Sequence, residues 1–268
     1  MIKKILWLDW LFIFSATLLL LLSAAKYYSE SQARLSLGAD VVISSSSRKT
    51  DMLMEIFTAV STVEKSVARL RETTVRAKET DERPNSRPMQ VTLLAIDASY
   101  PIYGTLDVSQ KIRPDTLSST GKGDSHGALV SASLIRDLSI SPGDMLTLGT
   151  SSLMVTGILN TDPKILPLVS NLPVIIVSDR TYDYLVKEGV LFITPQMTHH
   201  MVRLNPSVDR AMWQNIQQRA FSANDTTAIS WWDYVPRHLL MIKMPFLLIT
   251  AGILLLILIV RFERRKNA

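Results

Sequence analysis

Residues 5–25 form an apolar run, ILWLDWLFIFSATLLLLLSAA, in which Asp9 is the only charged residue. A helix rises about 1.5 Å per residue, so a run of 21 residues spans the roughly 30 Å hydrocarbon core of a bilayer. A second run, residues 244–260, holds 17 apolar or small residues and reaches 22 when residues 239–243 are included. The sequence therefore predicts two membrane crossings that enclose one long segment.

Basic residues flank the two runs on the sides that face away from the long segment. They are Lys3 and Lys4 before the first run, and Arg261, Arg264, Arg265 and Lys266 after the second. Lysine and arginine accumulate on the cytoplasmic side of membrane segments, so we expect both termini in the cytoplasm. Seven of the 29 basic and two of the 24 acidic residues lie outside residues 26–237, which leaves 22 of each sign within them. The net charge of +5 therefore reflects topology, and we expect no nucleic-acid partner.

This topology sets the expected domain boundaries. Residues 1–27 form a first transmembrane helix, residues 28–238 an extracytoplasmic domain, residues 239–261 a second transmembrane helix, and residues 262–268 a cytoplasmic basic tail. The first run has an alternative interpretation as a cleavable signal peptide, because small residues precede Lys26. Its apolar centre is longer than that of an ordinary signal peptide, which favours a retained anchor. Both interpretations export the middle of the chain.

Aromatic and acidic residues mark the ends of the runs. Tyr27 and Tyr28 close the first run, and Trp231, Trp232 and Tyr234 precede the second. Tyrosine and tryptophan are enriched at membrane interfaces, so these residues predict an outer aromatic belt. Asp9 lies near the inner end of the first run, where it either reaches the inner interface or contacts a partner helix within the membrane.

The exported segment mixes strand-like and helix-like patterns. Short apolar or alternating stretches predict strands at 39–47, 66–77, 89–98, 128–130, 172–178 and 199–205, and a hairpin at 145–159 with a turn at Gly149 to Ser152. Helical spacing and capping residues predict helices at 51–60, 132–138, 180–189 (capped by Asp179) and 206–221, the last with Pro206 in its first turn. We therefore expect an α+β domain of two subdomains, in which the N- and C-terminal parts fold together and the middle hairpins form an insertion.

Three segments carry a resemblance to a known family. They are LGADVVISSSS at 37–47, VTLLAIDASYPIYGTL at 91–106 and GALVSASLIRDLSISPGDMLTLGTSSLMVTGIL at 127–159. Their order and spacing resemble the extracytoplasmic domain of the MacB/FtsX-like ABC transporter permeases, above all the YbbP-type branch. The resemblance covers residues 1–260 and implies the fold of the MacB-like periplasmic core domain. Its family-like turn consists of Tyr100, Pro101, Tyr103 and Gly104.

The resemblance implies a non-enzymatic subunit of an ABC-type transporter or mechanotransmission assembly in the bacterial inner membrane, with its main domain in the periplasm. The implied partners are a separate ABC ATP-binding subunit and membrane lipid, and the domain would contact a lipid-like or protein substrate. Family members have at least four membrane helices, so we expect a split or truncated permease and a further permease subunit that supplies the missing helices. The alternative is a stand-alone membrane-anchored periplasmic binding or scaffold protein.

The residues themselves predict no catalytic, cofactor or metal site. The chain lacks cysteine and lacks a G-x-x-x-x-G-K-[ST] phosphate loop, so it is not expected to be the ATPase. The segment GKGDSHG at 121–127 places Asp124, Ser125 and His126 in succession, which is not the geometry of a catalytic triad. His199 and His200 are adjacent on an expected strand and would point to opposite faces, so they could not share a metal ion.

Overall fold

The computed structural model describes most of the chain. The described residues are 2–46, 62–78, 86–109, 126–161, 171–192, 196–221, 226–236, 239, 250, 252–254, 256, 257, 259 and 260. The expected helix at 51–60, together with Asp124 and Ser125, lies outside them. The chain divides into two compact units, one of Met1–Arg34 with Trp231–Ala268 and one of Leu35–Ser230.

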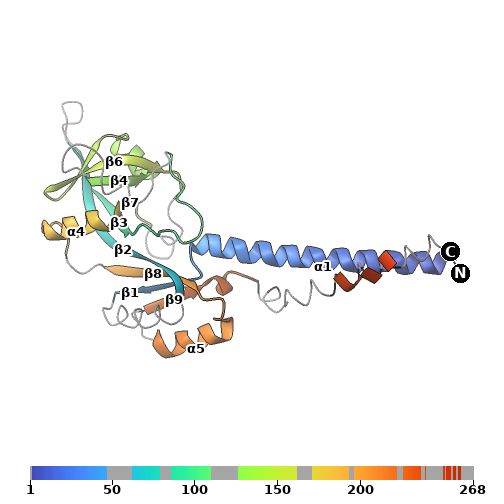
Figure 1. Cartoon of the computed structure of the whole chain (residues 1–268). Helices are drawn as coiled ribbons and strands as arrows, with labels where there is room; N and C mark the ends of the chain where they lie inside the picture. Colours follow the sequence, from blue (N-terminus) through green and yellow to red (C-terminus); the bar gives the residue numbers. More distant parts are fainter. Residues whose placement is uncertain are drawn as a thin grey trace. The chain divides into compact units, whose positions relative to one another are not determined.

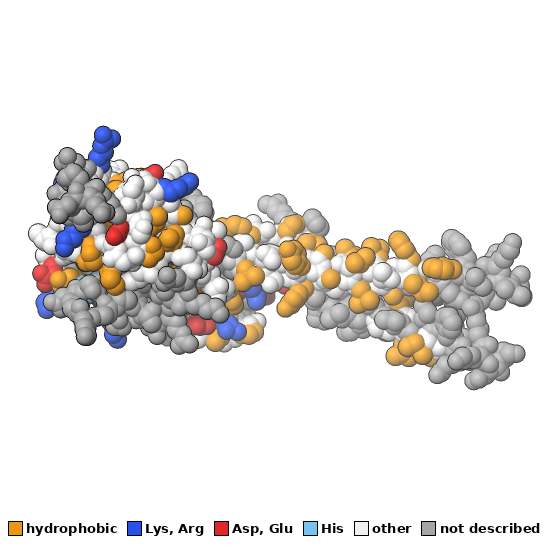
Figure 2. Space-filling model, turned by 90° about the horizontal axis from the view of Figure 1, so that it is seen from above, with side chains coloured by type: hydrophobic (Ala, Val, Ile, Leu, Met, Phe, Trp, Pro, Cys, Tyr) orange, Lys and Arg blue, Asp and Glu red, His pale blue; other side chains and the backbone are white. Residues whose placement is uncertain are grey.

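The first helix, α1 (Ile2–Leu37), continues well beyond the apolar run. Gly38 ends the helix with φ +73°, a left-handed conformation that glycine adopts without steric cost. Figure 2 shows hydrophobic side chains gathered over the described part of this helix. Within the part of the chain that the structure describes, no helix combines the length and the apolarity needed to cross a membrane.

The second unit is built on one mixed sheet of nine strands (Figure 1). The strands are β1 (Val41–Ser45), β2 (Thr62–Ala77), β3 (Met89–Ile96), β4 (His126–Ser131), β5 (Met145–Leu148), β6 (Ser151–Leu159), β7 (Val174–Ser178), β8 (Met197–Leu204) and β9 (Thr226–Ser230). Their order is β3-β7-β4-β6-β5-β2-β8-β1-β9, and β3 also pairs with β2. The first six strands in that order therefore form a closed ring, and β8, β1 and β9 extend the sheet from β2.

Strand β2 belongs to both parts of this sheet. Its first half pairs with β8, and its second half pairs with β3 and then β5. At Ala68, Arg69 and Leu70 the strand has β3 on one side and β8 on the other. Strands from the two ends of the unit, β1, β8 and β9, therefore lie together beside the first half of β2, and strands from the middle of the chain complete the ring at its second half. We call these two parts of the sheet its subdomains.

Helix α5 (Arg210–Ala220) covers the N- and C-terminal subdomain beside β1 and β9 (Figure 1). Its side chain Trp213 is buried, and Gln217 donates a hydrogen bond to the carbonyl oxygen of Ala228 on β9 at 2.9 Å. The prediction that Pro206 lies in the first turn is wrong. The helix begins later because the Asp209 carboxylate accepts the amide hydrogen bond of Met212 at 2.8 Å and caps it there.

Two helices pack against the ring, α3 (Ala132–Leu138) and α4 (Asp179–Lys187). The bounds of α3 coincide with the predicted helix at 132–138. For α4, the prediction that Asp179 caps the helix is wrong, because the Ser178 hydroxyl accepts the amide hydrogen bond of Thr181 at 3.2 Å. Buried aliphatic side chains from both helices, such as Leu134 and Leu185, meet those of the ring strands and form its core.

Candidate coupling site beside the first helix

The turn that follows β3 lies against the end of α1. The amide of Tyr103 donates a hydrogen bond to the carbonyl oxygen of Gly38 at 2.9 Å, and the Tyr100–Pro101 peptide bond is cis. Gly104 has φ +86°, and a Cβ atom added there would lie 3.4 Å from a methyl carbon of Leu35, in the last turn of the helix. The four residues singled out in the sequence therefore sit directly beside the point where α1 ends.

Asp40 connects this turn to strand β8. The residue is buried just after α1, and its Oδ2 atom accepts hydrogen bonds from the Tyr103 hydroxyl at 3.1 Å and from the Leu204 amide at 3.0 Å. Its own amide donates to the carbonyl oxygen of Val202 at 3.0 Å. One side chain thus connects the end of α1 to the turn and to Leu204 on β8, which comes 164 residues later in the chain.

Tyr100 anchors the same turn in the hydrophobic core. Its side chain is buried in a cluster that includes Leu37 and Ala39, the residues on either side of Gly38. Burial raises the pKa of the Tyr100 phenol above its ordinary value, so the side chain stays neutral at physiological pH. The turn therefore contacts the end of the helix through apolar side chains as well as through Asp40.

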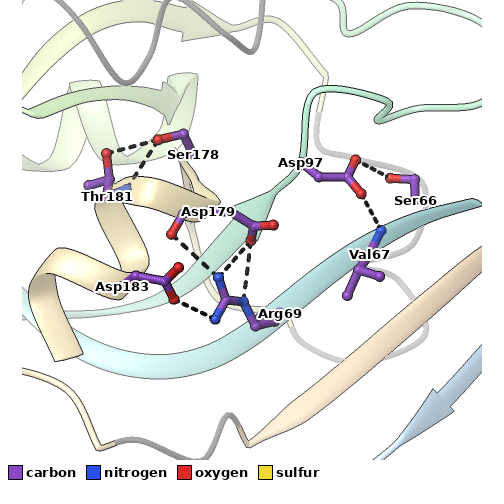
Figure 3. Close-up of polar contacts among 8 residues, drawn as sticks. All are labelled: Ser66, Val67, Arg69, Asp97, Ser178, Asp179, Thr181 and Asp183. Atoms are coloured by element: carbon purple, nitrogen blue, oxygen red, sulfur yellow. Dashed lines mark hydrogen bonds and ion pairs between the residues drawn. The ribbon is translucent and has the colours of Figure 1, made fainter. Parts of the chain in front are cut away.

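Asp97, at the start of the turn, holds the shared strand β2 (Figure 3). Its carboxylate accepts hydrogen bonds from the Ser66 hydroxyl at 2.6 Å and from the Val67 amide at 2.7 Å. A third hydrogen bond comes from the amide of Ser99 at 3.0 Å. Since Asp97 follows β3 directly, it joins the turn to β2 just before that strand enters the ring.

Arg69 continues the connection from β2 to helix α4 (Figure 3). Its guanidinium bonds Asp179 through Nη2 at 3.0 Å and through Nε at 3.2 Å, and it bonds Asp183 through Nη1 at 2.7 Å. The guanidinium carbon also lies 4.5 Å from the centroid of the Tyr182 ring. Burial raises the pKa of the Asp179 carboxyl, and the positive charge of Arg69 opposes this shift. The ion pairs hold the helix against the strand that both subdomains share.

The other residues singled out in the sequence do not join this site. Asp9 lies within α1, but its side chain lies outside the described residues. The His126 ring lies 4.1 Å from that of Tyr184, and His199 is buried with Nδ1 2.7 Å from the Ser44 hydroxyl oxygen. Among the described residues, no group of three or more histidine, cysteine, aspartate or glutamate side chains is placed to hold a metal ion.

Sequence reasoning found the turn but missed its partners. Asp40, Asp97 and Arg69 stand in ordinary strand-and-turn contexts, and their partners lie 30 to 164 residues away along the chain. The one sequence signal was the position of Asp97, a carboxylate that follows an apolar strand and precedes a proline-containing turn.

Comparison with known protein families agrees with the sequence resemblance. The profile of the MacB-like periplasmic core domain family matches residues 12–218. Among solved structures, the periplasmic region of MacB from Actinobacillus actinomycetemcomitans matches with a TM-score of 0.46 and 8% identity, over 73% of this chain and 92% of that one. The extracellular domain of the ABC-type transporter YknZ from Gram-positive bacteria matches with a TM-score of 0.41 and 13% identity, over 68% and 87%. No curated protein sequence matches the chain significantly.

Proposed function

The chain belongs to the MacB-like periplasmic core domain family, and on that premise we propose that it is a membrane subunit of an ABC-type transport assembly. Domains of this family are associated with transporters and are not catalytic. In our proposal the domain transmits movement between the membrane and the periplasm. The observation that carries the proposal is the bonding of Asp40 to both the turn and β8, at the residue where the chain leaves α1.

Membrane attachment through residues 1–27 and 239–261, with both termini in the cytoplasm and the domain in the periplasm, is part of the proposal. Large apolar side chains on α1 support it, because Trp10, Phe14 and Leu21 are 66%, 69% and 62% exposed. Continuous apolar surface on a helix favours a lipid or protein environment over water. Within this arrangement Asp9 would reach the inner interface or meet a helix of a partner subunit.

The bonded path from α1 explains how movement would reach the whole domain. Asp40 connects the end of α1 to β8 and to the turn. Asp97 connects the turn to β2, and Arg69 connects β2 to α4. Each step is a hydrogen bond to a carboxylate oxygen at 2.6 to 3.1 Å, within the range of well-formed hydrogen bonds. The proposed partners are a separate ATP-binding subunit, a permease subunit with further membrane helices, and membrane lipid.

Purification of the tagged full-length chain from its native membranes, in mild detergent, tests the assembly. We expect an ATP-hydrolysing subunit with a phosphate-binding loop to co-purify, together with a membrane protein. Recovery of the chain alone would contradict this proposal and would favour the stand-alone binding or scaffold protein.

A second experiment tests the coupling site in the recovered complex. The substitution Tyr103→Phe removes one hydroxyl donor from Asp40, and Tyr100→Phe is the matched control in the same turn. We expect ATP to change the hydrogen exchange of β8 amides in the unsubstituted complex and in Y100F, and to change it much less in Y103F. Equal responses in all three complexes would contradict a coupling role for the Tyr103 contact with Asp40.

A further inference from the structure

The two chain connections to the periplasmic unit meet at one contact. The unit of Leu35–Ser230 begins directly after Arg34 and ends directly before Trp231. These two flanking residues touch, since the guanidinium carbon of Arg34 lies 4.7 Å from the centroid of the Trp231 ring. The residue just before the periplasmic unit and the residue just after it are therefore in contact with each other.

Neighbouring residues reinforce this contact. The Trp231 and Trp232 rings are stacked with their centroids 4.9 Å apart, within the short helix η3 (Trp231–Asp233). Ala33, Val235 and Leu239 are buried with Trp231 in one hydrophobic cluster. Tryptophan offers the best ring face for a cation–π contact, and removal of water from around the contact strengthens it.

The position of Trp231 corrects one sequence expectation. Trp231 is only 6% exposed and packs within the protein, so it does not belong to an outer aromatic belt, whereas Tyr27 is 69% exposed. Arg34 lies nine residues after Ala25, the last residue of the apolar run, which at about 1.5 Å per residue places it roughly 13 Å beyond the run along α1. The contact thus lies outside the apolar run, on the side of the periplasmic unit.

We propose that Arg34 and Trp231 form a latch that holds the outgoing and returning connections together, so that the two move as one. The inference rests on the proposed function, because a tied pair of connections transmits displacement that two independent, flexible ones would absorb. Arg34 and Trp231 are positioning residues in this scheme. They contact no substrate, and they set the geometry in which α1 meets the returning chain.

Distance measurement between two spin labels tests the latch directly. The chain has no cysteine, so the paired substitutions Tyr27→Cys and Tyr234→Cys, both at exposed positions, place one label on each connection. The full-length chain is reconstituted in phosphatidylcholine and phosphatidylglycerol vesicles. We expect one narrow distance distribution, a roughly twofold broader one in Trp231→Ala, and a distribution close to the original in Trp231→Phe, which keeps an aromatic face.

Trp10→Ala is the matched control, since it removes an exposed tryptophan from α1 far from the latch. Arg34→Met keeps the apolar stem and removes the charge, and we expect it to broaden the distribution less than Trp231→Ala does. An unchanged width in Trp231→Ala would overturn the proposal. If that variant does not fold, the result for Arg34→Met decides, and an unchanged width there overturns it. The vesicles contain only this chain, so the outcome is independent of whether an ATP-binding partner exists.

Discussion

His199 should make the stability of the periplasmic unit fall as the pH is lowered. The residue is fully buried on β8, opposite Ser44 on β1 and Ala68 on β2. Its Nδ1 atom lies 2.7 Å from the Ser44 hydroxyl oxygen, and its Nε2 atom is buried without a hydrogen-bond partner among the described residues. Burial lowers the pKa of His199 from 6.5 to about 4, and the charge of His200 adds to this effect.

The size of the effect follows from these two values. In the unfolded chain the imidazole binds a proton as the pH falls through 6.5, whereas in the folded chain it stays neutral down to about pH 4. Between these values the unfolded state binds more protons, so the free energy of unfolding decreases as the pH falls. One pKa unit corresponds to about 1.36 kcal/mol, so the shift corresponds to a loss of about 3 kcal/mol, most of it reached by pH 4 and almost none of it present above pH 7.

Urea unfolding of the full-length chain in detergent measures this loss. Tryptophan fluorescence follows the transition, and the buried Trp213 on α5 contributes a signal from the same subdomain. The variant His199→Gln cannot titrate, so we expect it to lose about 3 kcal/mol less stability than the original chain between pH 7.5 and pH 4. His200→Gln is the matched control and should keep most of the loss, because burial is the larger cause of the shift. Equal pH dependence of the original chain and H199Q would refute the reasoning.

Three further substitutions test local energetics by urea unfolding. Arg69→Met should lower the free energy of unfolding by about 1–3 kcal/mol, because it leaves the partly buried Asp179 without its partner. Arg203→Met removes an exposed ion pair with Glu64 and should change the same free energy by less than about 0.5 kcal/mol. Asp209→Ala should cost about 1 kcal/mol through loss of the α5 cap, and Asp209→Asn should cost little. Gly104→Ala should cost about 1–2 kcal/mol, because its φ of +86° strains any side chain. The first argument is contradicted if Arg69→Met lowers the free energy of unfolding no more than Arg203→Met does. The second and third are contradicted if Asp209→Ala or Gly104→Ala leaves that free energy unchanged.

Local sequence pattern was enough to predict those elements whose bounds depend mainly on their own residues. Helix α3 has the predicted bounds, and the β5 and β6 hairpin turns at Gly149, which has φ +57°. Local pattern did not determine the cap positions, because several residues near each helix start can accept an amide hydrogen bond. Ser178 rather than Asp179 has the required extended backbone and reaches Thr181.

Long-range features could not be predicted from the sequence. The first residues of β2 look polar and exposed, so the strand was expected to begin at 66, yet pairing with β8 extends it back to Thr62. The residue types of the turn at 100–104 marked it as special, but its contact with Asp40 depends on how β1, β8 and the end of α1 come together. Tryptophan is common at membrane interfaces, which is why the sequence placed Trp231 there. In the structure its ring instead packs against Arg34, a contact that the sequence does not reveal.

The shared strand β2 determines how the proposed coupling would act on the two subdomains. At Ala68 to Leu70 it is paired on both sides, so neither subdomain can turn about this segment without breaking sheet hydrogen bonds. Asp97 bonds the strand just before this stretch, at Val67, and Arg69 bonds α4 from within it. A displacement that enters at Asp40 would therefore carry both subdomains together, as a rigid body, and would not open a hinge between them. A partner that senses this movement would consequently respond to the position of the whole domain.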